Sequence, residues 1–459
     1  MILRTLRCRN RNMPGVLGRL LTMIGDQGGY VGEIETVSFG NNYAVRDIDI
    51  LCENEAILQK ILDAVKRAPD VDVLEVRDEV MDIHRGGKIC SQPTHPIRSV
   101  ADLRKVYTPG VADVSRAVVE RPELAEIYSS IGSTVAICTN GSRVLGLGNI
   151  GPEASMPVME GKAALLTQFV GLNAWPVLIG TRDINEFVET VVKISSTFAA
   201  IHLEDIETPA CFEIEEKLIE RLNKPVMHDD QHGTAVAALA AVISACKEIG
   251  MDLATAKVGQ VGLGAAGFAI SRLVAKYTGQ PVKGCDRNSD AVARFKAGGG
   301  IESSMDDILV ESDIVLMTTG VKGLLKPDRV RKGSVVMALS NPNPEIDPQE
   351  AMQAGAAIAV DGRSVNNILG YPGIWKGALD AKASRIVPEM LIAAAEAIAQ
   401  EAHGDDELLP SPLNLSVHRS VAAAVARAAM KAGVAQKTLD EDYFHHIRGE
   451  QVIRTAGPS

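Results

Sequence analysis

The chain has 459 residues, of which 46% are hydrophobic and 23% charged, as in an ordinary globular protein with roughly two to four domains. Its net charge of −11 argues against a nucleic-acid partner and means that an anionic substrate needs a local cation or metal. No apolar stretch reaches membrane-spanning length, which argues against a membrane partner. The seven dispersed cysteines, with no CxxC pair, indicate reduced thiols in a cytoplasmic chain.

The first 81 residues predict a separate module with the order βαββαβ, the ferredoxin-like unit. Its strands are expected at residues 2–9, 33–39, 44–52 and 71–80, and its helices from residue 14 onward and at 56–65. Five arginines precede Asp26, the first acid, as they do in a transit peptide. The strand–turn–helix pattern of the same segment favours an intact, folded N-terminus instead.

An α/β region follows this module. Residues 82–96 are interpreted as a linker, after which helices alternate with strands such as 134–139 and 176–179. Repeated βαβ units then predict a parallel, Rossmann-like sheet. Its strands are expected near residues 257–261, 282–286, 313–318, 334–340 and 356–360, with tail helices at 381–402 and 416–432. The fold class is therefore α/β, with a catalytic domain at 97–250 and a cofactor domain with C-terminal helices at 251–459.

Two pairs of adjacent acids each close a short apolar run. Glu204 and Asp205 end the run 197–205, and Asp229 and Asp230 end the run 224–230. Such runs predict buried strands with carboxylates at their C-terminal ends, where open α/β sheets bind ligands. Carboxylate oxygens suit Mg²⁺ or Mn²⁺. The acids therefore predict a metal site.

Three histidines flank the two acid pairs and open a second interpretation, a histidine-rich metal site. They are His202, His228 and His232. Because several carboxylates are available as ligands, we favour histidines that support the ligands or pack in the core.

A dinucleotide motif follows about thirty residues after the acids. It spans Gly262, Gly264, Ala265, Ala266 and Gly267, after a predicted strand and at the start of a predicted helix. The glycines permit a tight turn, close approach of a pyrophosphate and helix–strand packing, while the helix N-terminus offers free N–H groups to phosphates. Asp286 ends the next strand, where an acid holds ribose hydroxyls and favours NAD; Arg287 could instead hold a 2′-phosphate of NADP. Metal, nucleotide and acids together suggest metal-assisted redox chemistry.

Further segments carry residues with two interpretations each. Tyr107 precedes a Pro-Gly turn, where an aromatic side chain usually only packs. Lys162 follows a glycine at an expected helix start, where a cation opposes the helix dipole, so it is either solvated or kept for another reason. The glycine-rich segment 139–151 implies close backbone approach to another group. Asn341 lies in a Pro-rich loop at the end of the strand expected at 334–340.

Together these segments resemble the malic enzyme family, in the family's order over residues 95–435. The matching segments are Tyr-Thr-Pro-Gly-Val-Ala (107–112), Asn-Gly-Ser-Arg-Val-Leu-Gly-Leu-Gly-Asn-Ile-Gly (140–151), Glu-Gly-Lys (160–162), Leu-Glu-Asp-Ile (203–206), His-Asp-Asp-Gln-His-Gly-Thr-Ala (228–235), Ser-Asn-Pro (340–342) and Asn-Asn (366–367). The small prokaryotic branch fits best. The N-terminal module departs from the basic family pattern and resembles ACT sensor domains in its element order and its segment 13–18.

The resemblance implies oxidative decarboxylation of (S)-malate to pyruvate and CO₂ with reduction of NAD, or of NADP as the alternative. It implies three ligands for Mg²⁺ or Mn²⁺: Glu204, Asp205 and Asp230. It implies three catalytic residues: Lys162 as general base, Tyr107 as general acid and Asp229 as the acid paired with the lysine. It implies three substrate-holding residues: Arg143, Asn341 and Asn367. Asn341 is also expected at the cofactor.

Two other functions stay open. The same chemistry could release lactate in a malolactic conversion that recycles tightly held NAD, or the scaffold could be a non-catalytic effector-binding protein. A homodimer is expected. The ACT resemblance implies a small-metabolite effector at the turn before the first helix, at Asn12, Gly15, Val16 and Leu17. The competing interpretation is a module that only dimerises the chain.

Overall fold

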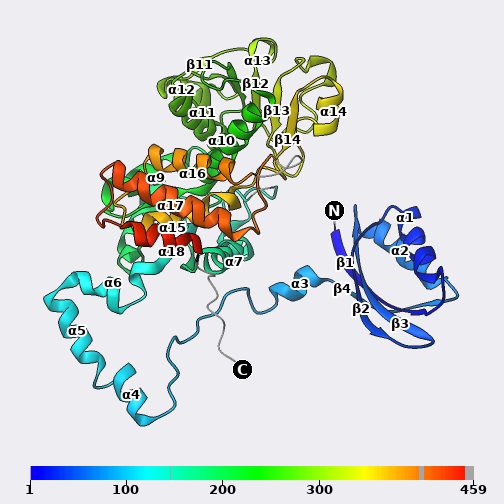
Figure 1. Ribbon diagram of the computed structural model, residues 1–459, viewed down its shortest axis with the longest axis horizontal. Helices are drawn as coiled ribbons and strands as arrows, with labels where there is room; N and C mark the ends of the chain where they lie inside the picture. The colour runs from blue at the N-terminus through cyan, green and yellow to red at the C-terminus, as the bar shows by residue number, and fades with distance from the viewer. Residues whose placement is uncertain (1, 145, 403–407, 450–459) are drawn as a thin grey trace. The chain divides into compact units, whose positions relative to one another are not determined.

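A computed structural model describes residues 2–144, 146–402 and 408–449 (Figure 1). The chain divides into two compact units, Met1–Ser91 and Gln92–Ser459. The first unit is an antiparallel sheet with two helices packed on one face. In chain order its elements are β1 (Ile2–Arg11), α1 (Val16–Asp26), β2 (Tyr30–Phe39), β3 (Tyr43–Cys52), α2 (Glu55–Lys66) and β4 (Val71–Arg77). The strand order β2-β3-β1-β4 is that of the expected βαββαβ unit.

The last strand of this unit is shorter than expected. The strand predicted at 71–80 ends at Arg77, because the Asp78 side chain accepts a hydrogen bond from the Met81 N–H (3.0 Å) and caps α3 (Glu79–His84). Val80 therefore lies in a helix. Helix α3 extends into the segment 82–96 that was interpreted as a linker, and the compact unit continues to Ser91.

The second unit contains a parallel four-stranded sheet with the order β6-β5-β7-β8. Its strands are β5 (Thr134–Thr139), β6 (Asn173–Leu178), β7 (Ala200–Leu203) and β8 (Val226–His228), connected by α7 (Gly151–Val170), α8 (Ile184–Ile194) and α9 (Ala210–Arg221). Strands β5, β7 and β8 are fully buried. All four strands run in the same direction, so their carboxyl ends lie at one edge of the sheet.

A second parallel sheet has six strands in the order β11-β10-β9-β12-β13-β14 and lies in the region expected to be the cofactor domain. The strands are β9 (Val258–Val261), β10 (Lys283–Cys285), β11 (Ile301–Glu302), β12 (Ile314–Met317), β13 (Val335–Ala338) and β14 (Ile358–Asp361). The accompanying helices are α11 (Ala265–Thr278), α12 (Ser289–Ala297), α13 (Met305–Glu311) and α14 (Pro348–Gln353). Counted along the chain this is the Rossmann order 3-2-1-4-5-6, whose direction reverses between β9 and β12. The two-residue β11 was not predicted.

Further helices belong to this unit. They are α10 (Asp229–Ile249), α15 (Tyr371–Asp380), α16 (Pro388–Gln400), α17 (Leu415–Lys431) and α18 (Glu441–Gly449). Helix α10 connects the two sheets along the chain, and the other four follow β14. The expectation that no apolar stretch reaches membrane-spanning length was wrong for α10, which is long and apolar enough, but 67% of that stretch is buried in the protein, as in a core helix. Helix α15 packs tightly on α17, since a Cβ atom on Gly377 would lie 2.3 Å from the carbonyl oxygen of Ala422.

Two short helices precede β5 and extend away from both sheets (Figure 1). They are α4 (Val100–Val106) and α5 (Val111–Glu120), followed by α6 (Ala125–Tyr128). Every residue of α4 and α5 is described, and none is buried. Val100 is 67% exposed and Val119 is 82% exposed. We call residues 97–120 the arm.

Candidate active site

The two acid pairs meet at the carboxyl ends of neighbouring strands. β7 ends at Leu203 and is followed by Glu204 and Asp205, while β8 ends at His228 and is followed by Asp229 and Asp230. The sequence predicted that the second pair closes a strand. Instead, Asp229 and Asp230 form the first turn of α10. An acid is favourable there, because the N–H groups of the first turn and the helix dipole present positive charge.

The three predicted metal ligands lie together. Glu204, Asp205 and Asp230 each offer a carboxylate oxygen, and these oxygens lie within 4.8 Å of one another. Oxygens on opposite sides of a single Mg²⁺ at about 2.1 Å are separated by about 4.2 Å, so small side-chain adjustments would bring this set around one divalent ion. Burial, and then the charge of Glu204, raise the pKa of Asp230 to about 6. A bound cation would relieve this concentration of negative charge.

Lys162 lies beside the same acids. Its Nζ donates a hydrogen bond to Asp229 and lies 3.1 Å from Oε1 of Glu204. Asn367 Nδ2 donates to Asp229 at 2.8 Å. Burial lowers the pKa of Lys162, but the charges of Asp229 and Glu204 outweigh it, so the pKa lies well above its usual range. In this arrangement Lys162 is an ammonium ion.

Lys162 was expected at a helix start, and that prediction was wrong. Helix α7 begins at Gly151 and continues through Pro157, so Lys162 lies in the helix interior. The helix dipole therefore does not bear on it. Its carboxylate partners, and the Tyr371 ring 4.5 Å from Nζ, account for the buried cation instead.

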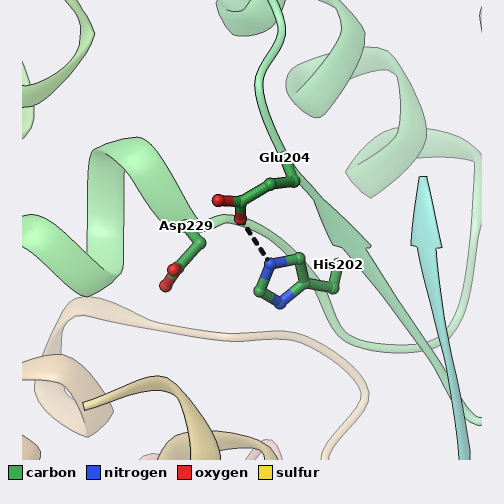
Figure 2. Close-up of side chains that lie close together, drawn as sticks. All are labelled: His202, Glu204 and Asp229. Atoms are coloured by element: carbon green, nitrogen blue, oxygen red, sulfur yellow. Dashed lines mark hydrogen bonds and ion pairs between the residues drawn. The ribbon is translucent and has the colours of Figure 1, made fainter. Parts of the chain in front are cut away.

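His202 supports the site and leaves a metal no nitrogen to bind. Its Nε2 lies 2.7 Å from Oε2 of Glu204, and its Nδ1 accepts a hydrogen bond from the Trp375 indole at 2.9 Å. Figure 2 shows the His202 ring directed at Glu204, with Asp229 near the same carboxylate. His202, Glu204 and Asp229 also satisfy the spacing of a metal site. Because both ring nitrogens are engaged, we favour Glu204, Asp205 and Asp230 as the ligand set.

The other two histidines contact a buried carboxylate that sequence reasoning missed. Glu215 on α9 accepts hydrogen bonds from the His228 N–H (2.7 Å) and from Gln231 Nε2 (3.1 Å), and it lies 3.1 Å from His232 Nε2. These contacts fix the first turn of α10 and hence the direction of Asp230. A glutamate on the buried face of α9, three residues before Leu218, was the available sequence signal.

The dinucleotide motif occupies the turn between β9 and α11. A Cβ atom on Gly267 would lie 2.0 Å from the Gly262 carbonyl oxygen, so close packing requires this glycine. Nothing lies within 4 Å of the Cβ position of Gly264, which leaves that side open to a ligand. Asp286 accepts a hydrogen bond from the Leu263 N–H at 2.6 Å. The motif thus lies where the strand order reverses, the usual position of a dinucleotide.

Comparison with known proteins identifies the family. The family description "Malic enzyme, N-terminal domain" matches residues 87–219, and "Malic enzyme, NAD binding domain" matches residues 348–433. The chain is 53% identical over 433 residues to NAD-dependent malic enzyme 1 of Bacillus subtilis, which covers 94% of this chain and 98% of the relative. The chain belongs to the malic enzyme family.

Two further relatives agree with this assignment. The bifunctional malic/malolactic enzyme of Bacillus subtilis is 40% identical over 397 residues, covering 80% of this chain and 97% of the relative. The crystal structure of malic enzyme from Pyrococcus horikoshii matches with a TM-score of 0.75 at 38% identity, covering 80% of this chain and 94% of that chain. The resemblance to the malic enzyme family and the α/β fold with a Rossmann-like domain are therefore confirmed.

The malic enzyme segments expected to hold substrate lie at three places. Asn367 contacts Asp229, as described above. The Arg143 side chain is exposed, and its N–H donates to the carbonyl oxygen of Asp205 at 3.0 Å. Asn341 follows β13 and donates to the Gly362 carbonyl oxygen at 2.8 Å. The structure brings Asn367 and the Arg143 backbone to the acids, and leaves Asn341 at the ends of β13 and β14.

The glycine-rich segment 139–151 contacts its own backbone. A Cβ atom on Gly141 would lie 2.0 Å from the carbonyl oxygen of Gly151. At this glycine, the close approach predicted from the sequence is thus between two parts of the same loop.

Tyr107 is a predicted site residue that makes no contact with Lys162 or the acids in the described structure. It ends α4 in the arm and is 67% exposed. Among the described residues, no hydrogen bond or ring contact joins Tyr107 to Lys162 or to the acids. Within one chain, the cluster therefore lacks the predicted proton donor.

Proposed function

We propose that this chain is an NAD-dependent malic enzyme that oxidises (S)-malate and decarboxylates the product to pyruvate and CO₂. The buried cluster of Lys162 with the acids at the ends of β7 and β8, in a unit with a Rossmann sheet, carries the proposal. The identity of 53% to NAD-dependent malic enzyme 1 supports it. Initial rates with malate, Mn²⁺ and either NAD or NADP test it; no NADH formation under any of these conditions would contradict it.

Different residues of the site would bind the metal, transfer the proton and hold the substrate. Glu204, Asp205 and Asp230 would hold Mg²⁺ or Mn²⁺, which when bound polarises the malate hydroxyl and the later carbonyl oxygen. Lys162 takes the proton of the C2 hydroxyl as hydride leaves C2 for the nicotinamide. It becomes a base only when the negative charge around it is compensated, because Asp229 and Glu204 otherwise hold it as an ammonium ion. Arg143 pairs with a substrate carboxylate.

We propose that Tyr107 protonates the enolate at C3 in the active site of a second copy of the chain. Tyr107 lies at the end of α4 in the exposed arm, and among the described residues no hydrogen bond or ring contact joins it to Lys162 or to the acids. The exposed apolar residues of the arm support a homodimer in which each arm carries Tyr107 to the partner's cluster.

Mixing two inactive variants tests this arrangement. Tyr107→Phe retains Lys162, and Lys162→Ala retains Tyr107, so a mixed dimer has one complete site if the tyrosine acts on the partner. After co-refolding at equal amounts we expect about one quarter of wild-type activity, because half of the dimers are mixed and each has one complete site of two. No recovery above the separate variants would show that tyrosine and lysine act within one chain.

NAD is favoured over NADP because Asp286 lies against the dinucleotide turn. Its carboxylate would accept ribose hydroxyls and repel a 2′-phosphate. Arg287 beside it is exposed and is the competing determinant. Asp286→Ser should shift kcat/KM toward NADP by about tenfold or more, and a wild-type preference for NADP would contradict the proposal.

Malolactic conversion is the second candidate, favoured by the 40% identity to the bifunctional malic/malolactic enzyme. Product analysis separates the two: net NADH with pyruvate, or lactate without net NADH. A non-catalytic protein on the same scaffold is disfavoured by the intact set of acids and Lys162.

We also propose that the first unit binds a small metabolite, such as an amino acid or a carboxylic acid, and changes activity. The turn before α1 supports this, because Gly15 has φ +83° and no side chain caps the helix. Asn12 Nδ2 donates to the Gly40 carbonyl oxygen at 2.9 Å, and the Val16 N–H donates to the Met13 carbonyl oxygen at 3.3 Å, so the Leu17 N–H is the donor at the helix start to be tested as a ligand contact. An effector coupling of about 1–3 kcal/mol would change the apparent affinity for malate about 5- to 150-fold. Deleting residues 1–91 should abolish that response; an unchanged response, or no effector in a metabolite screen, favours a module that only dimerises the chain.

A further inference from the structure

A buried chain of hydrogen bonds links an indole to the acid cluster. Trp375 Nε1 donates to His202 Nδ1 at 2.9 Å, His202 Nε2 lies 2.7 Å from Glu204 Oε2, and the other oxygen of Glu204 lies 3.1 Å from Lys162 Nζ. Trp375 and His202 are both 0% exposed. We propose that Trp375 and His202 are positioning residues that set how Glu204 is presented to the divalent cation and to Lys162, an inference that rests on the proposed metal-dependent function.

The direction of each hydrogen bond follows from the chemistry of the groups. An indole N–H can only donate, so Nδ1 of His202 is the acceptor and carries no proton. A neutral imidazole has one N–H, which must then be on Nε2, and it donates to Glu204. Trp375 and Glu204 thus require the same histidine tautomer, and Trp375 holds the ring so that its N–H meets one oxygen of Glu204.

The packing keeps both rings from turning away. Trp375 lies on α15, which approaches α17 so closely that Cβ atoms on Gly373 and Gly377 would collide with it. The Tyr371 ring meets the His202 ring edge-on, with centroids 5.6 Å apart. His202 itself lies in the fully buried strand β7, two residues before Glu204. The hydrogen bonds therefore act on groups with little freedom to find other partners.

Removing only the indole N–H has a specific consequence. Without it, the buried Nδ1 lone pair of His202 has no donor, and the ring loses the contact that aligns its Nε2–H with Glu204. Glu204 then turns or shares its charge differently with Lys162. Partners that orient metal ligands in this way typically change metal affinity by about 10- to 100-fold when they are removed.

The test compares the two tryptophans of the full-length enzyme. Trp375→Phe retains an aromatic ring but removes the N–H, and Trp175→Phe is the matched control, since Trp175 lies in β6 and is 42% exposed. Mn²⁺ binding is measured by the electron paramagnetic resonance signal of free Mn²⁺, without malate or nucleotide. We expect a Kd about tenfold or more above wild type for Trp375→Phe, and a wild-type Kd for Trp175→Phe.

A double-variant cycle distinguishes a positioning role of Trp375 from a general loss of packing around the site. His202→Phe removes the donor to Glu204, so adding Trp375→Phe to it should raise the Kd no further. Losses that multiply, or a wild-type Kd in Trp375→Phe, would overturn the inference. If wild type itself binds no Mn²⁺, the proposed metal-dependent function fails instead.

A measurement without a Trp375 variant covers the case in which that variant does not fold. In Trp175→Phe, Trp375 is the remaining indole, and its emission should shift as Mn²⁺ saturates the acids. Glu204→Gln in the same background should remove the shift. An emission spectrum unchanged by saturating Mn²⁺ would show that Trp375 is not coupled to the site.

Discussion

The two compact units each contain a cluster of charged residues, and the clusters differ in which sign is in excess. In the first unit Asp47 accepts two hydrogen bonds from Arg7, both at 2.7 Å, and another from Arg77. The arginine bonds hold the pKa of Asp47 below its usual range. In the second unit Lys162 is the cation nearest to several acids, and the pKa of Asp230 is raised to about 6 by burial and Glu204.

The difference separates a cluster that is complete from one that requires a ligand. An acid with two cations stabilises the fold that contains it. Acids gathered against one another destabilise the fold until a cation binds, and proteins retain such arrangements mainly where function needs them. The second cluster should therefore determine activity and the first should determine stability.

The largest expected effect is on the acid-rich cluster. Asp230→Asn removes one ligand charge and should lower kcat by at least about a hundredfold, as loss of a strong electrostatic stabiliser does. The metal-free variant should melt no lower than wild type, because the replaced carboxylate is repelled by Glu204. Steady-state rates and thermal melting in chelator measure the two effects. Full wild-type activity in excess chelator would contradict the metal site.

The next effect separates the proposed base from the proposed acid. Lys162→Ala should lose malate oxidation by about a hundredfold or more, the range of general-base contributions. Tyr107→Phe should retain reduction of added oxaloacetate better than overall turnover, because only the C3 protonation is lost. Rates for both reactions check this. Wild-type turnover in Tyr107→Phe would exclude the tyrosine as the proton donor.

A smaller effect concerns pH. Because the pKa of Asp230 is about 6 in the metal-free protein, protons compete with the cation, and the Mn²⁺ Kd should rise as the pH falls from 7 to 5. Mn²⁺ binding should therefore weaken at low pH, whereas the metal-free protein should become more stable there. A raised carboxyl pKa means that the folded state binds the proton more tightly, so this contribution to stability falls as the pH rises from about 4 to about 6. Asp230→Asn should remove both dependences; if the variant keeps them, another group is responsible.

The sequence predicted the contiguous parts of the site and missed contacts between distant segments. Glu204, Asp230 and the glycine motif follow short buried strands, so local pattern alone indicated their positions. Trp375 and His202 are 173 residues apart, and no periodicity relates an indole to a histidine at that separation. Lys162 was misplaced because the preceding Gly161 resembles a helix boundary, whereas α7 continues through both Pro157 and Gly161.

The smallest effect on activity is expected in the arginine-rich cluster of the first unit. Asp47→Asn leaves Arg7 and Arg77 without their carboxylate, and should lower the stability of this unit by about 2 kcal/mol at pH 7, the range for hydrogen bonds to charged groups. A lowered carboxyl pKa contributes stability above the unfolded value and loses it as the pH falls through the folded one. The difference between Asp47→Asn and wild type should therefore shrink below about pH 4. Urea unfolding at several pH values, together with kcat for malate, measures both. A large loss of kcat with unchanged stability would show that this cluster, too, serves the reaction.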